Sequence, residues 1–197
     1  MEIDMKNWLS RGGEAFLEDI GIKKGDVILD FGCGAGYYTI PAAGVVRSEG
    51  KVYAMDKDIE SIHKLIEIVK TKGLENIISI YSKSEESKIN LESESIDVVL
   101  LYDILHYMDV LERKRVYEEI YRILKTGGIL SVYPKHHKSD EPLGDLSDME
   151  LDDVIEEINS QHFYLQGKFY KKLLHNGNYN MGYILNFRKK VEKTSAK

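Results

Sequence analysis

The stretch VILDFGCGAGYYTIPAA, residues 27–43, decides the fold of this chain. It starts as a short apolar run ending in Asp30, continues with glycines at positions 32, 34 and 36, and then becomes helix-like. This order lets the backbone approach a nucleotide-like ligand closely, because glycine lacks Cβ and tolerates positive φ. The G-x-G-x-x-G/A fingerprint of dinucleotide sites does not fit, since its third glycine would fall on Tyr37 or Thr39.

The composition is that of a single globular domain covering residues 1–197. A formal net charge of −6 argues mildly against a nucleic-acid partner. No apolar run is long enough for a membrane span, and the polar N-terminus lacks a signal-peptide pattern. The single cysteine, Cys33, excludes an internal disulfide and fits a reducing, cytoplasmic location. The oligomeric state is left open.

Strand-like and helix-like segments alternate along the chain, which predicts an α/β fold with a doubly wound, mostly parallel sheet. An Asn-Gly pair between two strand-like runs adds a C-terminal antiparallel hairpin. The expected strands are 27–30, 51–55, 77–81, 97–101 and 129–133, followed by hairpin strands 163–174 and 179–187. The expected helices are 59–69, ended by Gly73, then 110–124, broken by Gly127 and Gly128, and 151–158.

The two ends of the chain carry separate expectations. Residues 1–24 have the pattern of one or two short helices, which either pack on the sheet or cap a ligand cleft. We favour capping slightly. Residues 188–197 form a basic tail, which we expect to be mobile and solvated rather than a binding arm.

Ligands of open α/β sheets lie beyond the carboxyl ends of the strands. That rule brings the segments 31–37, 82–86, 101–107 and 134–138 around one cleft, together with Asp56. Asp56 ends the second expected strand, where a carboxylate can accept hydrogen bonds from both hydroxyls of a ribose.

With these features, the chain resembles the class I S-adenosylmethionine-dependent methyltransferases of the small quinone-biosynthesis-like type (methyltransferase domain 11/25). The resemblance covers roughly residues 20–187 and implies a Rossmann-like seven-stranded sheet whose last strand is antiparallel. The matching motifs are LDFGCGAG (29–36), VYAMD (52–56), SEESKINL (84–91), SIDVVLLYDILHYMD (95–109) and EEIYRILKTGGIL (118–130).

The resemblance implies S-adenosyl-L-methionine as cofactor and places its parts along the chain. The glycine loop would lie against the methionine part, with Asp30 near its amino group. Asp56 would bind the ribose, and Glu85 the adenine amino group, although Glu85 stands where many relatives have Asp. The implied cofactor-binding set is Asp30, Gly32, Gly34, Gly36, Tyr37, Asp56, Lys57, Glu85, Glu86 and Tyr102.

The residues agree with such a cofactor on physical grounds. A sulfonium zwitterion has no phosphate and needs no cation in the loop, and residues 30–40 contain neither Lys nor Arg. Its ammonium and sulfonium charges favour an acidic and aromatic site. For Tyr37 and Tyr38, packing between helix and sheet weighs about as much as cofactor contact.

Asp103 and His106 are the catalytic candidates, because their segment borders the methyl group and the acceptor in the resembling family. For His106, a packing role is favoured over acceptor binding or base catalysis. Together with His136, these residues could bind a metal or deprotonate a hydroxyl acceptor, but their wide spacing predicts no metal site. The roles of His136 and His137 stay open, and Cys33 is expected to be a packing residue.

The predicted function is methyl transfer to a small-molecule acceptor. The alternatives are a cofactor-binding partner or regulatory protein with little activity and, more remotely, a nicotinamide oxidoreductase. The single cysteine argues against arsenite as acceptor, since arsenite methylation in the resembling family uses several thiols. The thirteen tyrosines weakly favour a hydrophobic ring compound as the acceptor.

Overall fold

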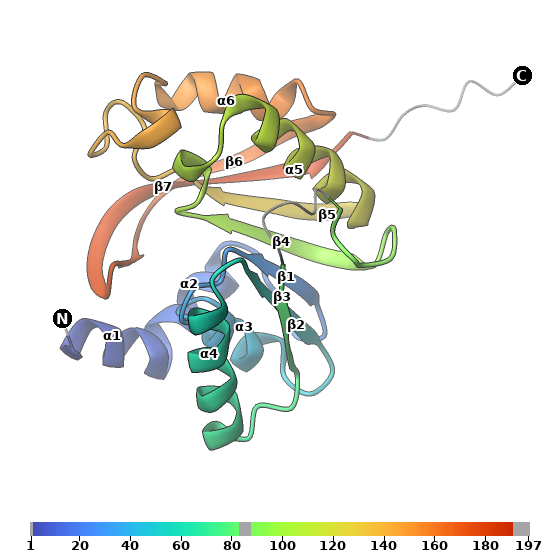
Figure 1. Ribbon diagram of the computed structural model, residues 1–197, viewed down its shortest axis with the longest axis vertical. Helices are drawn as coiled ribbons and strands as arrows, with labels where there is room; N and C mark the ends of the chain where they lie inside the picture. The colour runs from blue at the N-terminus through green and yellow to red at the C-terminus, as the bar shows by residue number, and fades with distance from the viewer. Residues whose placement is uncertain (1, 83–87, 191–197) are drawn as a thin grey trace, which may run out of the picture.

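The computed structural model describes residues 2–82 and 88–190 (Figure 1). Its seven-stranded sheet has the order β3-β2-β1-β4-β5-β7-β6, with β1 to β5 parallel and β7 antiparallel to both of its neighbours. The predicted mostly parallel sheet with a C-terminal antiparallel hairpin is thereby confirmed. The strands are β1 (Val27–Phe31), β2 (Lys51–Asp56), β3 (Ile77–Tyr81), β4 (Ile96–Tyr102), β5 (Leu124–Tyr133), β6 (Phe163–His175) and β7 (Asn178–Lys189).

Helices cover both faces of the sheet (Figure 1), and each face has its own cluster of buried apolar side chains. On one face lie α1 (Glu2–Asn7), a π-helical turn (Trp8–Gly12), α2 (Gly13–Asp19), α3 (Thr39–Val46) and α4 (Ile59–Lys72). On the other lie α5 (Val110–Ile123) and α6 (Leu151–Asn159), with 3₁₀ turns at Leu105–Tyr107 and Gly144–Leu146.

Local signals set the ends of α4 and α5. The Asp58 carboxylate accepts hydrogen bonds from the first backbone N–H groups of α4, and Gly73 ends that helix in the left-handed region at φ 64°. Asp109 and Glu112 form a capping box at the start of α5. These caps place the two helices beside the carboxyl ends of the strands that precede them.

The start of β5 differs from the prediction. The strand begins at Leu124, directly after α5, whereas the sequence placed a glycine break at 127–128 and a strand only from 129. The pairing with β4 shifts register between Ile96 and Val98, and Gly127 lies inside the strand with φ 78°. A glycine that permits a bulge interrupts the hydrogen-bond ladder without ending the strand. The strand therefore continues through Gly127, and its start, predicted at residue 129, was placed too late.

The Asn-Gly hairpin signal is confirmed. Asn176 and Gly177 form the two-residue turn with φ 49° and 76°, and His175 pairs with Asn178 across it. Only Leu185–Arg188 of β7 pair with β5, and beyond them the two hairpin strands curve away from the sheet (Figure 1). Because the hairpin strands β6 and β7 are long, the turn between them reaches the carboxyl end of the parallel strands.

The first helices pack against the rest of the fold. Trp8 is buried, its Nε1 donates to the backbone oxygen of Tyr37 at 2.7 Å, and its ring centroid lies 5.3 Å from those of Phe16 and Tyr38. Neither Trp8 nor Phe16 lines the cavity described below, so both side chains pack on the rest of the fold. Capping of the cleft by residues 1–24 stays a prediction.

The basic tail begins later than residue 188, because β7 continues to Lys189. Residues 191–197 lie outside the described part, so the expected mobility of the tail stays a prediction. Within residues 2–82 and 88–190, every helix is too short or too polar to cross a membrane.

Candidate active site

A cavity of about 530 Å³ opens at the carboxyl ends of β1, β2 and β4. Its walls come from the loop after β1, the end of β2, the segment after β4, one face of α5 and the tip of the β6–β7 hairpin. A cleft at the strand ends therefore exists as predicted, except that the predicted segment 134–138 contributes no residue to its lining. The predicted site residues that line it are Gly32, Gly34, Tyr37, Asp56, Lys57, Tyr102 and Asp103.

Asp56 fastens the glycine loop to β2. Its Oδ2 accepts a hydrogen bond from the backbone N–H of Gly34 at 2.7 Å, and its Oδ1 accepts from that of Asp58 at 2.8 Å. The backbone N–H groups of Gly32 and Cys33 donate to the carbonyl oxygen of Met55 at 2.8 and 3.0 Å. A carboxylate has about four acceptor sites, so Asp56 keeps capacity for a ligand in the cavity.

The loop glycines meet different steric needs. All three have positive φ. A Cβ on Gly32 would meet Ile104 at 2.5 Å, and one on Gly36 would meet Leu65 at 2.5 Å. Gly34, by contrast, has no atom within 4 Å of that position among the described residues, so its backbone faces open space in the cavity.

Asp30 lies behind the loop rather than in the cavity wall. It is 3% exposed, and its Oδ2 accepts a hydrogen bond from Thr39 Oγ1 at 2.6 Å. Burial raises the pKa of this carboxyl to about 7, partly offset by the Thr39 bond. Gly36 also lies outside the cavity lining. Cys33 lines the cavity, and burial raises the pKa of its thiol, so the thiol stays protonated at neutral pH.

Tyr37, Tyr38 and Tyr102 all line the cavity. The Tyr38 hydroxyl donates to the backbone oxygen of Leu174 at 2.7 Å, which ties the loop to the hairpin. The Tyr102 hydroxyl shares a 2.8 Å hydrogen bond with Ser131, and its ring lies 4.7 Å from that of Tyr38. Packing and cavity lining are thus combined in the same side chains.

Of the residues predicted to lie beside the adenine, the structure describes only Lys57. Lys57 lines the cavity, as do Ser82 and Lys88 on either side of residues 83–87, which the structure does not describe. Glu85 and Glu86 lie outside the described residues.

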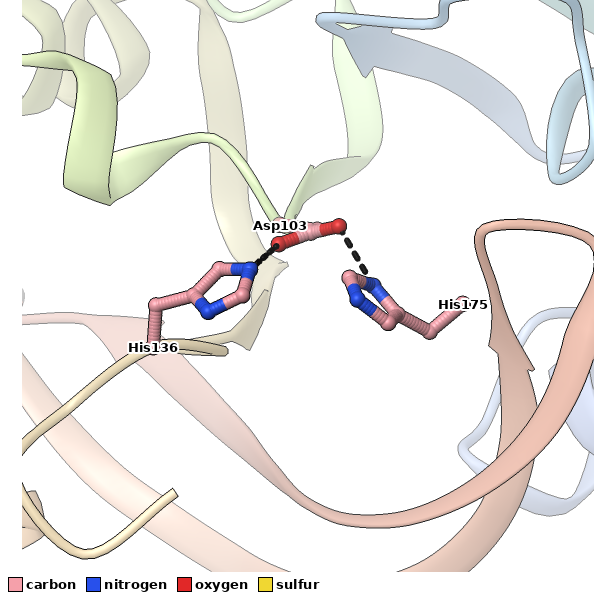
Figure 2. A group of neighbouring side chains, drawn as sticks. All are labelled: Asp103, His136 and His175. Carbon is pink, nitrogen blue, oxygen red and sulfur yellow. Dashed lines mark ion pairs between the residues drawn. The ribbon is translucent and has the colours of Figure 1, made fainter. Parts of the chain in front are cut away.

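Figure 2 shows a group of polar side chains in which Asp103 lies between His136 and His175. Of these, Asp103 and His175 line the cavity. His175 Nδ1 lies 2.7 Å from Asp103 Oδ2, and His136 Nε2 lies 3.6 Å from Oδ1. The Nδ1 of His106 is 3.7 Å from the same Oδ1. The sequence prediction included His106 and His136 but missed His175, whose only signal was its place beside the hairpin turn. His137 is buried and accepts from the Ser139 N–H instead.

Burial controls the protonation of this group. Burial lowers the pKa of His106 to about 4, and the charges of His136 and His175 add to the effect, so His106 is neutral at pH 7. Among the described residues, neither of its ring nitrogens has a hydrogen-bond partner. Burial also raises the pKa of Asp103, against the opposing pull of His175 and His136.

The fold and the cavity agree with a comparison against known protein families, in which a methyltransferase-domain model matches residues 22–187. The chain belongs to the methyltransferase domain family. The broad resemblance inferred from the motifs is therefore confirmed, while the match does not extend to the quinone-biosynthesis-like subtype.

The named relatives of this chain differ in the acceptors that their names give. The chain is 29% identical over 126 residues to the sterol 24-C-methyltransferase erg6 of Aspergillus fumigatus, which is 64% of this chain and 32% of that protein. It is 31% identical over 108 residues to the arsenite methyltransferase of Halobacterium salinarum, which is 55% of this chain and 27% of that protein. The chain thus spans about a third or less of the length of these two relatives.

The fold is shared over nearly the whole chain with a solved structure. A SAM-dependent methyltransferase from Aquifex aeolicus aligns with a TM-score of 0.71 and 24% identity, covering 94% of this chain and 98% of the other.

Proposed function

We propose that this methyltransferase binds S-adenosyl-L-methionine in the cavity and transfers its methyl group to a small-molecule acceptor. The observation that carries the proposal is the glycine loop fastened by Asp56 at the mouth of a cavity beyond the strand ends. A volume of about 530 Å³ is in the usual range for small-molecule and cofactor sites.

The donor would lie along the loop. Asp56 would accept hydrogen bonds from the ribose hydroxyls, Lys57 would lie beside the adenine, and the open backbone at Gly34 would face the methionine part. Tyr37 and Tyr102 would supply aromatic surface to the sulfonium. Asp30 would act from behind the loop, through water or a loop movement, because it does not line the cavity. Glu85 and Glu86 keep their proposed place at the adenine.

Methyl transfer depends mainly on the positioning of the donor and the acceptor. The acceptor's nucleophile attacks the sulfonium methyl in line, so holding the two reactants together supplies much of the rate. Asp103 borders the acceptor end of the cavity in this proposal, beside Tyr102. His106 does not line the cavity and is neutral, which favours a packing or positioning role over direct base catalysis.

The acceptor in this proposal is a small organic molecule. Arsenite is disfavoured, because the chain offers one cysteine and its thiol stays protonated. Ile104, Tyr107 and Met108 give the acceptor side of the cavity apolar and aromatic surface, which suits a hydrophobic ring compound. The quinone-biosynthesis-like subtype is proposed on this ground and on the sequence motifs.

Two measurements test the proposal. Isothermal titration with S-adenosylhomocysteine, the demethylated product of the donor, should show one site per chain. Incubation with methyl-labelled S-adenosylmethionine and a panel of phenols, quinols and carboxylic acids should then yield a labelled product. No heat of binding would contradict the whole proposal, whereas binding without any labelled product would favour a cofactor-binding protein with little activity.

A further inference from the structure

We propose that Asp103, His136 and His175 form a binding site for a divalent transition-metal ion in the wall of the cavity. One ligand atom from each residue lies within 4.8 Å of the other two (Figure 2). Two imidazoles and one carboxylate are a common protein donor set for zinc and for iron(II), with positions left open for other ligands. The site itself does not depend on the proposed methyl donor.

The spacing of the donor atoms suits such an ion. A tetrahedral metal with ligands at about 2.1 Å keeps its ligand atoms about 3.4 Å apart. His136 Nε2 lies 3.6 Å from Asp103 Oδ1, and His175 Nδ1 lies 2.7 Å from Oδ2. Small rotations of the three side chains would bring the donors to the ion. Asp103 follows β4, His136 lies in the segment after β5, and His175 is the last residue of β6, so the folded chain brings them together.

The hydrogen bonds of His136 favour a cation between it and Asp103. Its Nδ1 lies 2.7 Å from the backbone oxygen of Glu141, and a carbonyl oxygen only accepts, so Nδ1 carries the proton. In the neutral ring, Nε2 then directs its lone pair towards Asp103. The facing oxygen, Asp103 Oδ1, is buried and has no hydrogen-bond partner among the described residues. A bond from the second ring nitrogen to a backbone carbonyl is the usual support of a metal-binding histidine.

His175 can present its lone pair in the same way. Its buried Nδ1 has no hydrogen bond of good geometry within the described part of the chain, although Asp103 is close. Its Nε2 lies 3.1 Å from the side-chain amide of Asn176. A half-turn of that amide, whose oxygen and nitrogen are interchangeable in shape, lets its oxygen accept the Nε2 proton and frees Nδ1 for the metal.

The surroundings add a further polar group and balance the nearby charge. His106 is 3% exposed, both its ring nitrogens lack a partner among the described residues, and its Nδ1 is 3.7 Å from Asp103 Oδ1. The buried ammonium of Lys135 would repel a metal, but it is paired with Asp140 at 2.6 Å and with Glu141 at 3.3 Å. The site therefore offers donors and little uncompensated positive charge.

The donor set defines the class of ion. Imidazole nitrogen suits zinc, iron(II), cobalt(II) and nickel(II), whereas magnesium and calcium prefer sites made only of oxygen. Asp103 and His175 line the cavity, so a bound ion would direct its open positions into it. If the proposed function holds, those positions would face an oxygen-bearing acceptor and lower the pKa of its hydroxyl.

Cobalt(II) titration of the metal-stripped, untagged chain tests the site, because cobalt bound by histidine in a low-coordinate site absorbs visible light strongly. We expect saturation at one ion per chain and displacement of the cobalt by zinc. His136→Ala and His175→Ala each remove one donor and should weaken cobalt binding by roughly 100-fold or more. His63→Ala is the matched control, because His63 is exposed on α4 away from the cluster, and it should bind cobalt like the parent.

Thermal unfolding of each variant shows whether it folds, and the two histidines lie on different elements, so one folded variant is enough. A parent chain that retains no cobalt after desalting, or a folded His136→Ala or His175→Ala variant that binds cobalt as tightly as the parent, would overturn the site. Titration of the metal-free parent with S-adenosylhomocysteine is a separate readout. Its failure would count against the proposed methyl donor and not against the metal site.

Discussion

Replacing Asp56 by alanine tests the donor site most directly. In the structure the carboxylate accepts backbone hydrogen bonds from Gly34 at 2.7 Å and from Asp58 at 2.8 Å, and it lines the cavity. In the proposed function it also accepts hydrogen bonds from the ribose hydroxyls. The substitution therefore removes both the ribose contact and the support of the loop on which the donor lies.

The expected loss follows from those bonds. A hydrogen bond to a charged group contributes about 1.5–3 kcal/mol, so two ribose bonds amount to at least about 3 kcal/mol. Since about 1.4 kcal/mol is a factor of ten, the Kd for S-adenosylhomocysteine should rise at least about 100-fold. The two lost loop bonds should also lower the melting temperature, because the N–H of Gly34 loses its partner.

Isothermal titration with S-adenosylhomocysteine measures the affinity, and thermal unfolding measures the fold. Asp58→Ala is the control: Asp58 caps α4 through the N–H groups of Glu60 and Ser61 but does not line the cavity. It should cost about 1 kcal/mol of stability and leave the Kd unchanged. A folded Asp56→Ala variant whose Kd stays within about three-fold of the parent value would refute the reasoning, since that is well under the 1.4 kcal/mol of a tenfold change.

Three further predictions concern stability. Gly36→Ala should destabilise the fold by about 2–4 kcal/mol, because the positive φ and a 2.5 Å contact of the new Cβ both add strain. Gly34→Ala should cost only about 1–2 kcal/mol, because its φ is also positive but the space around it is open. Equal urea midpoints for the two variants would contradict this. Burial of Asp30 raises its pKa from 3.8 to about 7, so the folded state holds a proton that the unfolded state has released. Stability should fall as pH rises from about 4 to 7, by up to about 1.4 kcal/mol per pH unit, and Asp30→Asn should lack this decline in urea unfolding. Glu157→Gln should cost about 3–5 kcal/mol by leaving the buried Arg113 guanidinium, now 2.7 Å from that carboxylate, without its counter-charge; a thermal melt like the parent's would count against it.

The sheet could be predicted because its signals are local. Unbroken apolar runs such as 27–29 in β1 and 98–101 in β4 are typical of strands covered by helices on both faces, and the hairpin is marked by Asn176 and Gly177. The start of β5 was predicted wrongly because the consequence of Gly127 depends on its partner strand. The same glycine ends a helix in one pairing and forms a bulge in another, and the sequence alone does not contain the register.

That Gly32, Gly34 and Asp56 line the cavity was also predictable, because the two glycines come just after β1 and Asp56 is the last residue of β2. The place of Asp30 was not, since it depends on Thr39 and on the loop that covers it. Its raised pKa arises from burial, which is a property of the packed structure.

By itself, the sequence determined the strand–loop–helix unit, the family and the cleft at the strand ends, because short-range spacing encodes all of them. Only the tertiary structure decided that His175 meets Asp103. The two are separated by the whole of α5, β5, α6 and β6, and their contact depends on the length and curvature of a hairpin that extends beyond the sheet (Figures 1 and 2). Neighbouring residues fix a local motif, whereas a cluster of side chains from three distant segments depends on the packing of the whole chain.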